Sequence, residues 1–211
     1  MQILQAGSNH AAAVQLLRSR GMQQGVKHTI KTNGAYYMTM TVVDWADVFT
    51  RKNHKQAIVA ALQYCIAHKG LNIYAYCIMT NHLHLIANCD SPFQLSDTIR
   101  DFKRHLAHTI LRQIMNEPES RRENFMSIFK KEKHNGTKNK AFQFWKMGNH
   151  AIELYTEKFP WNKIHYIHNN PVAENFVAQP AHWLYSLASN YLEKHSVLLE
   201  VICILQIMKM L

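Results

Sequence analysis

The chain has 211 residues, which suits one domain with short appendages, and 47% of the residues are apolar, enough for a buried core. The formal net charge of +10 and the isoelectric point near 9.5 favour a polyanionic partner, nucleic acid or an anionic membrane surface, although an ordinary basic soluble protein can carry the same balance. No apolar run reaches the roughly 18 residues of a membrane-spanning helix, so we expect no such helix. Of the two polyanions, we expect nucleic acid as the partner and no membrane.

The amino-terminal residues and the cysteines indicate the compartment. Residues 1–25 lack the charged start, apolar run and small-residue cleavage site of a signal peptide. The four cysteines form no C-x-x-C pair, and a protein of this size needs no disulfide framework. We therefore expect a cytoplasmic protein.

Three regions follow from the pattern of residues. Residues 1–30 are weakly patterned and predict a flexible extension, residues 31–190 hold the periodic segments of a domain, and residues 191–211 form an apolar tail. From Val197 the tail fits a packing helix, a partner-binding helix or a poorly ordered end, and these alternatives stay open.

The first half of the domain alternates strands and helices. Ala35–Val43 alternates in steps of two and predicts a half-buried strand, followed by a loop over 44–51. Lys52–Lys69 carries one apolar stripe at helical spacing, and Gly70 is a natural stop. Strands over 72–78 and 82–88 are so close that only an antiparallel hairpin can join them.

The second half is more basic. Leu95 to about Met115 predicts a helix with Ser96 as its N-cap, and 116–140 is polar apart from an apolar patch at Phe125–Phe129. Residues 141–147 predict a fourth strand, 152–169 a third helix stopped by Pro171, and 172–195 an irregular aromatic segment.

This order predicts an α+β fold: a ferredoxin-like βαββαβ antiparallel sheet with helices on one face, plus a C-terminal helix that carries a tyrosine. Met38, Met40, Leu83 and Leu85 should face the helices. Thr39, Thr41, His82 and His84 should then lie on the opposite face, which we expect to be open and polar.

His82 and His84 are the first candidate site. Residues two apart in a strand point to the same side, so the two imidazoles can converge on one divalent cation. With 14 histidines in the chain, a chance pair is the alternative.

Tyr166 and Asn170 are the second candidate. They are four residues apart and lie on one face of the predicted third helix, near its end before Pro171. A tyrosine hydroxyl beside an amide oxygen suits a nucleophile next to a metal. A packing tyrosine and an ordinary helix terminator are the alternative.

Together these motifs resemble those of a known family. His82-Leu83-His84 resembles the His-hydrophobe-His motif of HUH endonucleases, and Tyr166-Ile167-x-x-Asn170-Pro171-Val172 resembles the tyrosine motif of single-tyrosine, IS200-like transposases, in particular the REP-associated ones. The resemblance extends to three further features: the lead-in Met79–His82, the helix start at Leu95-Ser96 and the pair Phe144-Trp145. The resemblance covers about residues 30–185, whereas the long basic connection from Lys103 to Phe142 departs from it.

The resemblance implies a metal-dependent endonuclease and strand transferase that acts on single-stranded or hairpin DNA through a 5′-phosphotyrosine. His82 and His84 would bind Mg²⁺ or Mn²⁺, Tyr166 would be the nucleophile, and Asn170 a third ligand, where related transposases often have Gln. His150 falls near a position that often holds His or Asp. Such proteins are monomers or homodimers, and the resemblance leaves open whether Tyr166 acts in cis or in trans.

Basic and aromatic residues supply candidate DNA contacts. These candidates are Arg100, Lys103, Arg104, Arg112, Lys130, Lys131, Trp145 and His150, with Tyr37 as a further stacking residue. A non-catalytic nucleic-acid-binding protein derived from a transposase would keep the basic surface without needing His82, His84 and Tyr166. A metal-dependent phosphoesterase that activates water would form no covalent bond to DNA.

Overall fold

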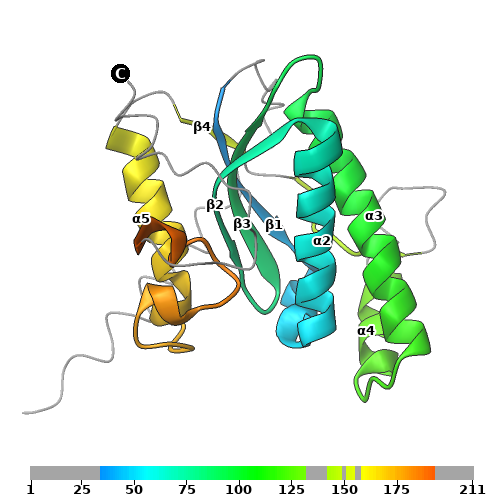
Figure 1. The fold of residues 1–211 in the computed structure, drawn as a ribbon. Helices are drawn as coiled ribbons and strands as arrows, with labels where there is room; N and C mark the ends of the chain where they lie inside the picture. Colours follow the sequence, from blue (N-terminus) through cyan, green and yellow to red (C-terminus); the bar gives the residue numbers. More distant parts are fainter. Residues whose placement is uncertain (1–33, 132–141, 149–150, 155–157, 193–211) are drawn as a thin grey trace, which may run out of the picture.

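A computed structural model of the chain describes residues 34–131, 142–148, 151–154 and 158–192 (Figure 1). The expected extension over residues 1–30 and the tail from residue 193 onward lie outside the described residues. None of the described helices has the length and apolar character needed to cross a membrane.

The described chain forms one antiparallel sheet with helices on both sides (Figure 1). The strands are β1 (Tyr36–Thr41), β2 (Leu71–Ile78), β3 (His82–Cys89) and β4 (Ile152–Glu153), in the order β2-β3-β1-β4. The main helices are α2 (Lys52–Lys69), α3 (Leu95–Asn116), α4 (Arg122–Lys131) and α5 (Lys158–Ala173). This strand order confirms the predicted ferredoxin-like α+β fold.

Helices α2 and α3 cover one face of the sheet, as the sequence predicted (Figure 1). Met38, Met40, Leu83 and Leu85 point into this core and are almost completely buried. Helix α2 ends where predicted, with Gly70 at a left-handed φ of 59°. The helix start at Leu95 is confirmed, but its N-cap is Gln94 without a side-chain hydrogen bond, so the predicted Ser96 cap is wrong.

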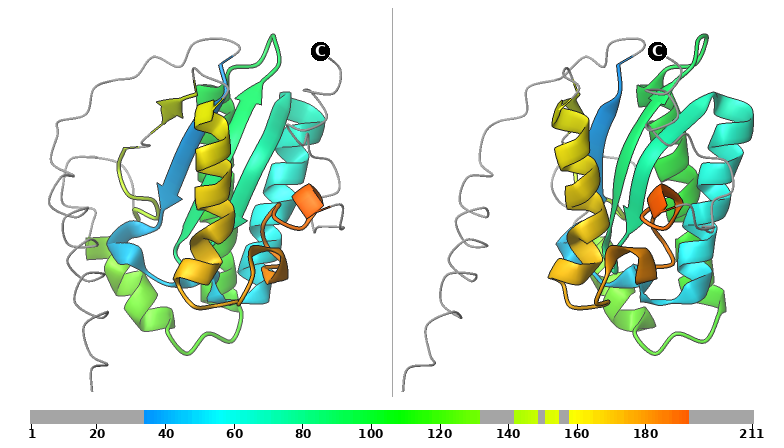
Figure 2. Two further views of the ribbon diagram at one scale, coloured as in Figure 1. Left: turned by 90° about the vertical axis from the view of Figure 1, so that its left-hand side faces the viewer. Right: turned by 60° about the vertical axis from the view of Figure 1, so that its left-hand side comes forward.

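The other face of the sheet is not open, which corrects our expectation. Figure 2 shows α5 lying across this face. Ile164 and Ile167 of α5 pack on Tyr37, Cys77 and Ile86 of the sheet in a second apolar cluster. The sequence assigned the named residues of β1 and β3 to their correct sides, but it did not predict where the amphipathic third helix packs. An apolar stripe on a helix needs a surface to bury it.

The predicted fourth strand over 141–147 is wrong. Strand β4 consists of Ile152 and Glu153, and Trp145 makes only an isolated bridge to Val42. Phe144 and Trp145 are consecutive, yet both are buried in the α2/α3-side core. Neighbouring residues of a regular strand point to opposite faces, so this segment packs as an irregular chain.

The predicted boundaries of the third helix are also wrong. Helix α5 begins at Lys158 and runs past Pro171 to Ala173. A proline inside a helix removes one N–H donor and crowds the carbonyl one turn earlier, but it does not have to end the helix. The chain leaves the helix at Asn175, where φ is 60° and the Phe176 N–H donates to the Pro171 carbonyl.

The aromatic segment after α5 returns to the sheet and pairs with β2. The Ile78 N–H donates to the Tyr185 carbonyl at 2.9 Å, and the Leu187 N–H donates to the Tyr76 carbonyl at 3.2 Å. The Trp183 indole N–H also donates to the Ile78 carbonyl at 3.0 Å. Helix α5 is therefore joined to β2 through its own chain, which holds it against this sheet.

Candidate active site

The two histidines lie at the start of β3, on the face covered by α5. In the antiparallel register, His82 is opposite Thr41 of β1 and His84 is opposite Thr39. His84 is buried, with 3% of its surface exposed, and His82 is half-buried. The alternation of β3 thus sends Leu83 into the helix-side core and both imidazoles to the same side, as predicted.

The imidazoles converge through their Nε2 atoms. The two Nε2 atoms are 3.0 Å apart. Each Nδ1 has its own partner: that of His82 is 2.7 Å from Asn81 Oδ1, and that of His84 is 2.9 Å from Thr39 Oγ1. When Nδ1 carries the proton and donates to these oxygens, both Nε2 lone pairs face the same small space.

Further polar groups hold the two rings in these orientations. The Asn81 amide donates to the Asp47 carboxylate at 2.9 Å, which fixes the side chain that contacts His82. On the other side, the Thr39 hydroxyl donates to the Tyr37 hydroxyl, which is 3.1 Å from His84 Nδ1. Both histidines are therefore oriented before any ligand arrives.

Burial keeps both imidazoles neutral. It lowers the pKa of His82 to about 4, against a small opposing effect of Asp47. It lowers the pKa of His84 to about 3, helped by the electrostatic effects of the neighbouring His82 and of Lys163 and opposed by a hydrogen bond with Asn170. Neutral imidazole is the form that binds metal ions, so both lone pairs are available at neutral pH.

The pair fits a divalent cation as two of its ligands. In an octahedral site with bonds of about 2.1 Å, neighbouring ligands are about 3.0 Å apart, the same as the separation of the two Nε2 atoms. Among the described residues, no three His, Cys, Asp or Glu side chains gather to hold a metal ion. The remaining ligands would have to be amide, substrate or water oxygens, which Mg²⁺ and Mn²⁺ prefer.

Helix α5 brings the tyrosine and the asparagine to the histidine pair. The Tyr166 ring centroid is 5.6 Å from that of His84, with the rings nearly perpendicular at 73°. Asn170, one turn later, lies within hydrogen-bonding reach of the His84 imidazole. Tyr166 keeps 53% of its surface exposed, so its ring contacts the site while remaining accessible.

Lys163 is a further candidate site residue, which the sequence pattern did not indicate. Its Nζ is 4.9 Å from the Tyr37 ring centroid and 5.8 Å from that of Tyr166. It precedes Tyr166 by three residues and therefore shares its helical face. That spacing is visible in the sequence, but it indicated a role for Lys163 only once the position of α5 was known.

The predicted DNA contacts Arg100, Lys103, Arg104 and Arg112 belong to α3, which lies on the opposite side of the sheet from α5 (Figure 1). Arg100 and Arg104 form ion pairs with Asp97 and Asp101, and Arg112 is exposed. Lys103 lies over the Trp145 ring, whose indole N–H donates to the Lys103 carbonyl. Lys130 is exposed on α4, whereas the Lys131 side chain and His150 lie outside the described part of the chain. Their roles stay predictions.

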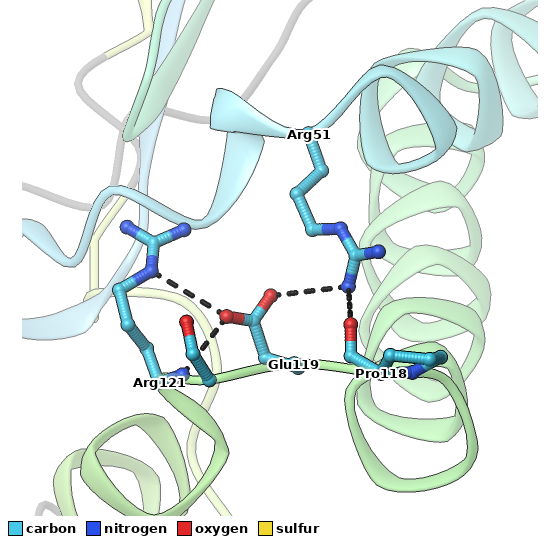
Figure 3. A pocket seen from close by; sticks show the side chains of 5 residues that line it. Arg51, Pro118, Glu119 and Arg121 are labelled. Atoms are coloured by element: carbon cyan, nitrogen blue, oxygen red, sulfur yellow. Dashed lines mark hydrogen bonds and ion pairs between the residues drawn. The ribbon is translucent and has the colours of Figure 1, made fainter.

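A separate pocket lies where α3 meets α4 (Figure 3). Arg51 and Arg121 both reach the Glu119 carboxylate, at 3.3 Å and 3.5 Å. The Glu119 side chain is almost buried, and the two arginines hold the pKa of its carboxyl below its usual range against the effect of burial. Since the carboxylate already occupies the space between the guanidinium groups, we assign this pocket a structural role.

We expect the free energy of unfolding to fall as the pH decreases from about 6.5 toward 4. Burial, helped by the charge of His165, lowers the pKa of His168 to about 4, and burial also lowers the pKa of His54. The unfolded chain therefore binds protons that the folded chain excludes, and His168 alone accounts for at most about 3 kcal/mol at pH 4. Urea unfolding at pH 7 and pH 5 measures the difference, which His168→Gln should reduce. Equal free energies at both pH values would contradict this expectation.

Comparisons with known proteins concern the family and the fold. Residues 31–129 match the family model described as transposase IS200 like. The match includes His82 and His84 and ends before α5. No curated protein matches the chain.

Eight chains of solved structures match. One is a REP-associated tyrosine transposase bound to a REP hairpin; it is 16% identical, with a TM-score of 0.58, over 80% of this chain and 84% of that chain. A second is a transposase from Deinococcus radiodurans R1, with 14% identity and a TM-score of 0.40 over 70% of this chain and 97% of that chain. The first similarity concerns the fold, whereas the family match rests on the sequence. Residues 31–129, which hold the histidine pair, are similar in sequence to the IS200-like transposase family.

Proposed function

We propose that the chain is a metal-dependent tyrosine transposase that nicks and rejoins single-stranded or hairpin DNA. The observation that carries the proposal is the placement of Tyr166 on α5, with its ring 5.6 Å from that of His84 in the same chain. The family match does not extend to α5, so the geometry links the tyrosine to the histidine pair. Because the structural neighbour is described with a REP hairpin, we extend hairpin DNA to this chain as a proposed substrate.

The chemistry is an exchange of phosphate esters. The Tyr166 hydroxyl oxygen attacks phosphorus and loses its proton, and the 3′ oxygen of the preceding nucleotide leaves and gains one. The product is a 5′-phosphotyrosine and a free 3′-hydroxyl. The phosphotyrosine conserves the energy of the cleaved bond, so a 3′-hydroxyl can reverse the step and join strands without ATP.

The residues around Tyr166 have separate tasks. His82, His84 and Asn170 would hold Mg²⁺ or Mn²⁺, which when bound supplies positive charge to the phosphate oxygens. Asn81 and Thr39 keep the two imidazoles in the orientation that presents Nε2. The Lys163 ammonium lies next to the rings of Tyr37 and Tyr166 and can stabilise negative charge on the phosphate.

The direction of cleavage gives a sharp test of this proposal. The full chain is incubated with Mn²⁺ and a DNA hairpin flanked by single strands, labelled at either its 5′ or its 3′ end. A 5′-phosphotyrosine attaches the protein to the 3′ fragment. The 3′-labelled DNA should therefore migrate with the protein on a denaturing gel, and the 5′-labelled DNA should give a free shortened strand.

Other outcomes distinguish the alternatives. Free fragments from both labels, without labelled protein, would indicate a phosphoesterase that uses water. Binding without cleavage would indicate a nucleic-acid-binding protein that has lost catalysis.

We expect Lys163→Met to slow formation of the covalent adduct by about 10- to 100-fold, because one cation next to the phosphate is lost. Binding to single-stranded DNA should also lose about 0.7 from the slope of log affinity against log salt. Lys163→Arg should retain part of the rate of adduct formation and part of the salt dependence of binding. Lys52→Met removes an exposed lysine from α2, on the other side of the sheet, and is the matched control. If both lysine variants behave alike, Lys163 has no special role at the phosphate.

A further inference from the structure

Trp45 presents an exposed aromatic ring beside the histidine pair. Its ring centroid is 6.0 Å from that of His82, and 53% of its surface is exposed. Its neighbours Val43 and Ala46 are buried in the core. A large indole left half in solvent next to a candidate active site is available to a ligand.

The backbone that presents Trp45 is strained. Asp44 and Trp45 have φ values of 52° and 53°, in the left-handed region that residues other than glycine rarely adopt. Two such residues in succession are energetically unfavourable. Strain of this kind persists only where surrounding contacts fix the chain, and it is concentrated at functional sites.

Hydrogen bonds from two other segments hold this turn in place. The Val42 N–H donates to the Asn81 carbonyl at 2.9 Å, and the Val43 N–H donates to the Phe144 carbonyl at 3.0 Å. The first bond joins the turn to the residue before His82. The position of the indole is therefore coupled to the position of the histidine pair.

A positive charge accompanies the ring. The Lys146 Nζ lies 4.8 Å from the Trp45 ring centroid. Lys146 follows Trp145 in the irregular segment and donates its backbone N–H to the Thr41 carbonyl at 2.8 Å, which ties the segment to β1. An aromatic ring next to an ammonium group is the combination that binds a nucleotide, with the base on the ring and the phosphate near the cation.

We propose that Trp45 and Lys146 form a subsite for an unpaired nucleobase, next to the phosphate that is bound at the histidine pair. The placement of that phosphate rests on the proposed function. Trp45 stacks on the base, and Lys146 contacts the backbone beside it. Stacking on a ring accepts any base but requires that the base be free of its own stack, so the subsite selects for unpaired DNA at this position.

The test is an abasic scan of a single-stranded oligonucleotide bound to the full chain. All proteins carry Tyr166→Phe, so that only equilibrium binding is measured, and each nucleotide in turn lacks its base. Removing the base that stacks on Trp45 should weaken binding of this parent protein by about five- to hundredfold. Trp45→Ala should bind intact DNA more weakly by a similar factor, and the same abasic position should then have no further effect.

Additional variants separate stacking from folding. Trp45→Phe should retain most of the affinity, and Trp45→Gly, which suits the left-handed backbone, should lose affinity without a fall in melting temperature. Tyr64→Ala removes an exposed ring from α2 and should bind like the parent protein. The proposal is overturned if Trp45→Ala loses no affinity for intact DNA. It is also overturned if every abasic position weakens the binding of Trp45→Ala by the same factor as the binding of the parent protein.

Failure of this proposal can be told apart from failure of the proposed function. The covalent-adduct assay with unmodified Tyr166 reports on catalysis alone. If the adduct forms but no abasic position shows a loss of affinity that depends on Trp45, only the subsite is rejected. If one abasic position shows a loss of affinity that depends on Trp45 but no adduct forms, only the catalytic proposal is rejected.

Discussion

Replacing Tyr166 with phenylalanine is expected to abolish the covalent protein–DNA adduct, a loss of at least about 10⁴-fold in rate, because the substitution removes only the attacking oxygen. The phenylalanine ring can keep the contact with the His84 ring. Tyr166 is half exposed, so we expect the melting temperature and the affinity for DNA to remain close to those of the unaltered chain. Single-turnover assays with 3′-labelled DNA measure the loss.

Tyr37 is the informative control for this prediction because it is the other tyrosine at the site. Burial raises the pKa of its phenol to about 12, which makes it a poor nucleophile, and its hydroxyl is 3.1 Å from His84 Nδ1. Tyr37→Phe should therefore keep the adduct while slowing its formation by about tenfold, the lower end of the effect of a residue that orients a ligand. If Tyr37→Phe abolishes the adduct and Tyr166→Phe does not, the nucleophile has been misassigned.

Replacing His84 with alanine is expected to reduce adduct formation by about a thousandfold, since the divalent cation would lose one of its two imidazole ligands. Binding of Mn²⁺ to the protein without DNA, followed by electron paramagnetic resonance, should weaken in parallel. That measurement does not depend on catalysis.

The two histidines should act as one unit. His82→Ala alone should resemble His84→Ala, and the double variant should lose little more than either, because one missing ligand already disables the site. His108→Ala removes an exposed histidine from α3 and should change neither metal binding nor rate. Effects of the two single substitutions that multiply in the double variant would argue against a shared cation.

Strand β3 shows what the sequence was able to predict. Alternation of polar and apolar residues placed His82 and His84 on one side and Leu83 and Leu85 on the other, and the cross-strand register with β1 agrees. This succeeded because side-chain direction in a strand depends only on position along the chain. Helix α2 was equally predictable, since its apolar stripe and its terminal glycine are local features of the sequence.

Long-range packing explains what could not be predicted. The sequence does not state that α5 crosses the histidine-bearing face of the sheet, so the expected open face was wrong. The irregular segment with Phe144 and Trp145 looked like a strand because both residues are apolar, but both are buried on the same side. Tertiary packing overrides local preference in such segments.

The two site residues that escaped notice have the same explanation. Lys163 looked like one of many lysines until α5 placed it over the rings of Tyr37 and Tyr166. Trp45 lay in a segment interpreted as a loop, and its exposure depends on two left-handed residues that the sequence does not specify. A role that arises from the meeting of distant segments leaves little trace in the neighbouring sequence.

The pairing of Tyr185 and Leu187 with β2 has a consequence for solubility. A strand at the border of a sheet offers unpaired N–H and C=O groups to any other chain, which makes it a template for aggregation. Here the chain's own segment occupies those groups at Tyr76 and Ile78, and at the opposite border β4 is only two residues long. In the described part of the chain, the same segment that holds the tyrosine helix in place therefore also protects the sheet from pairing with other copies.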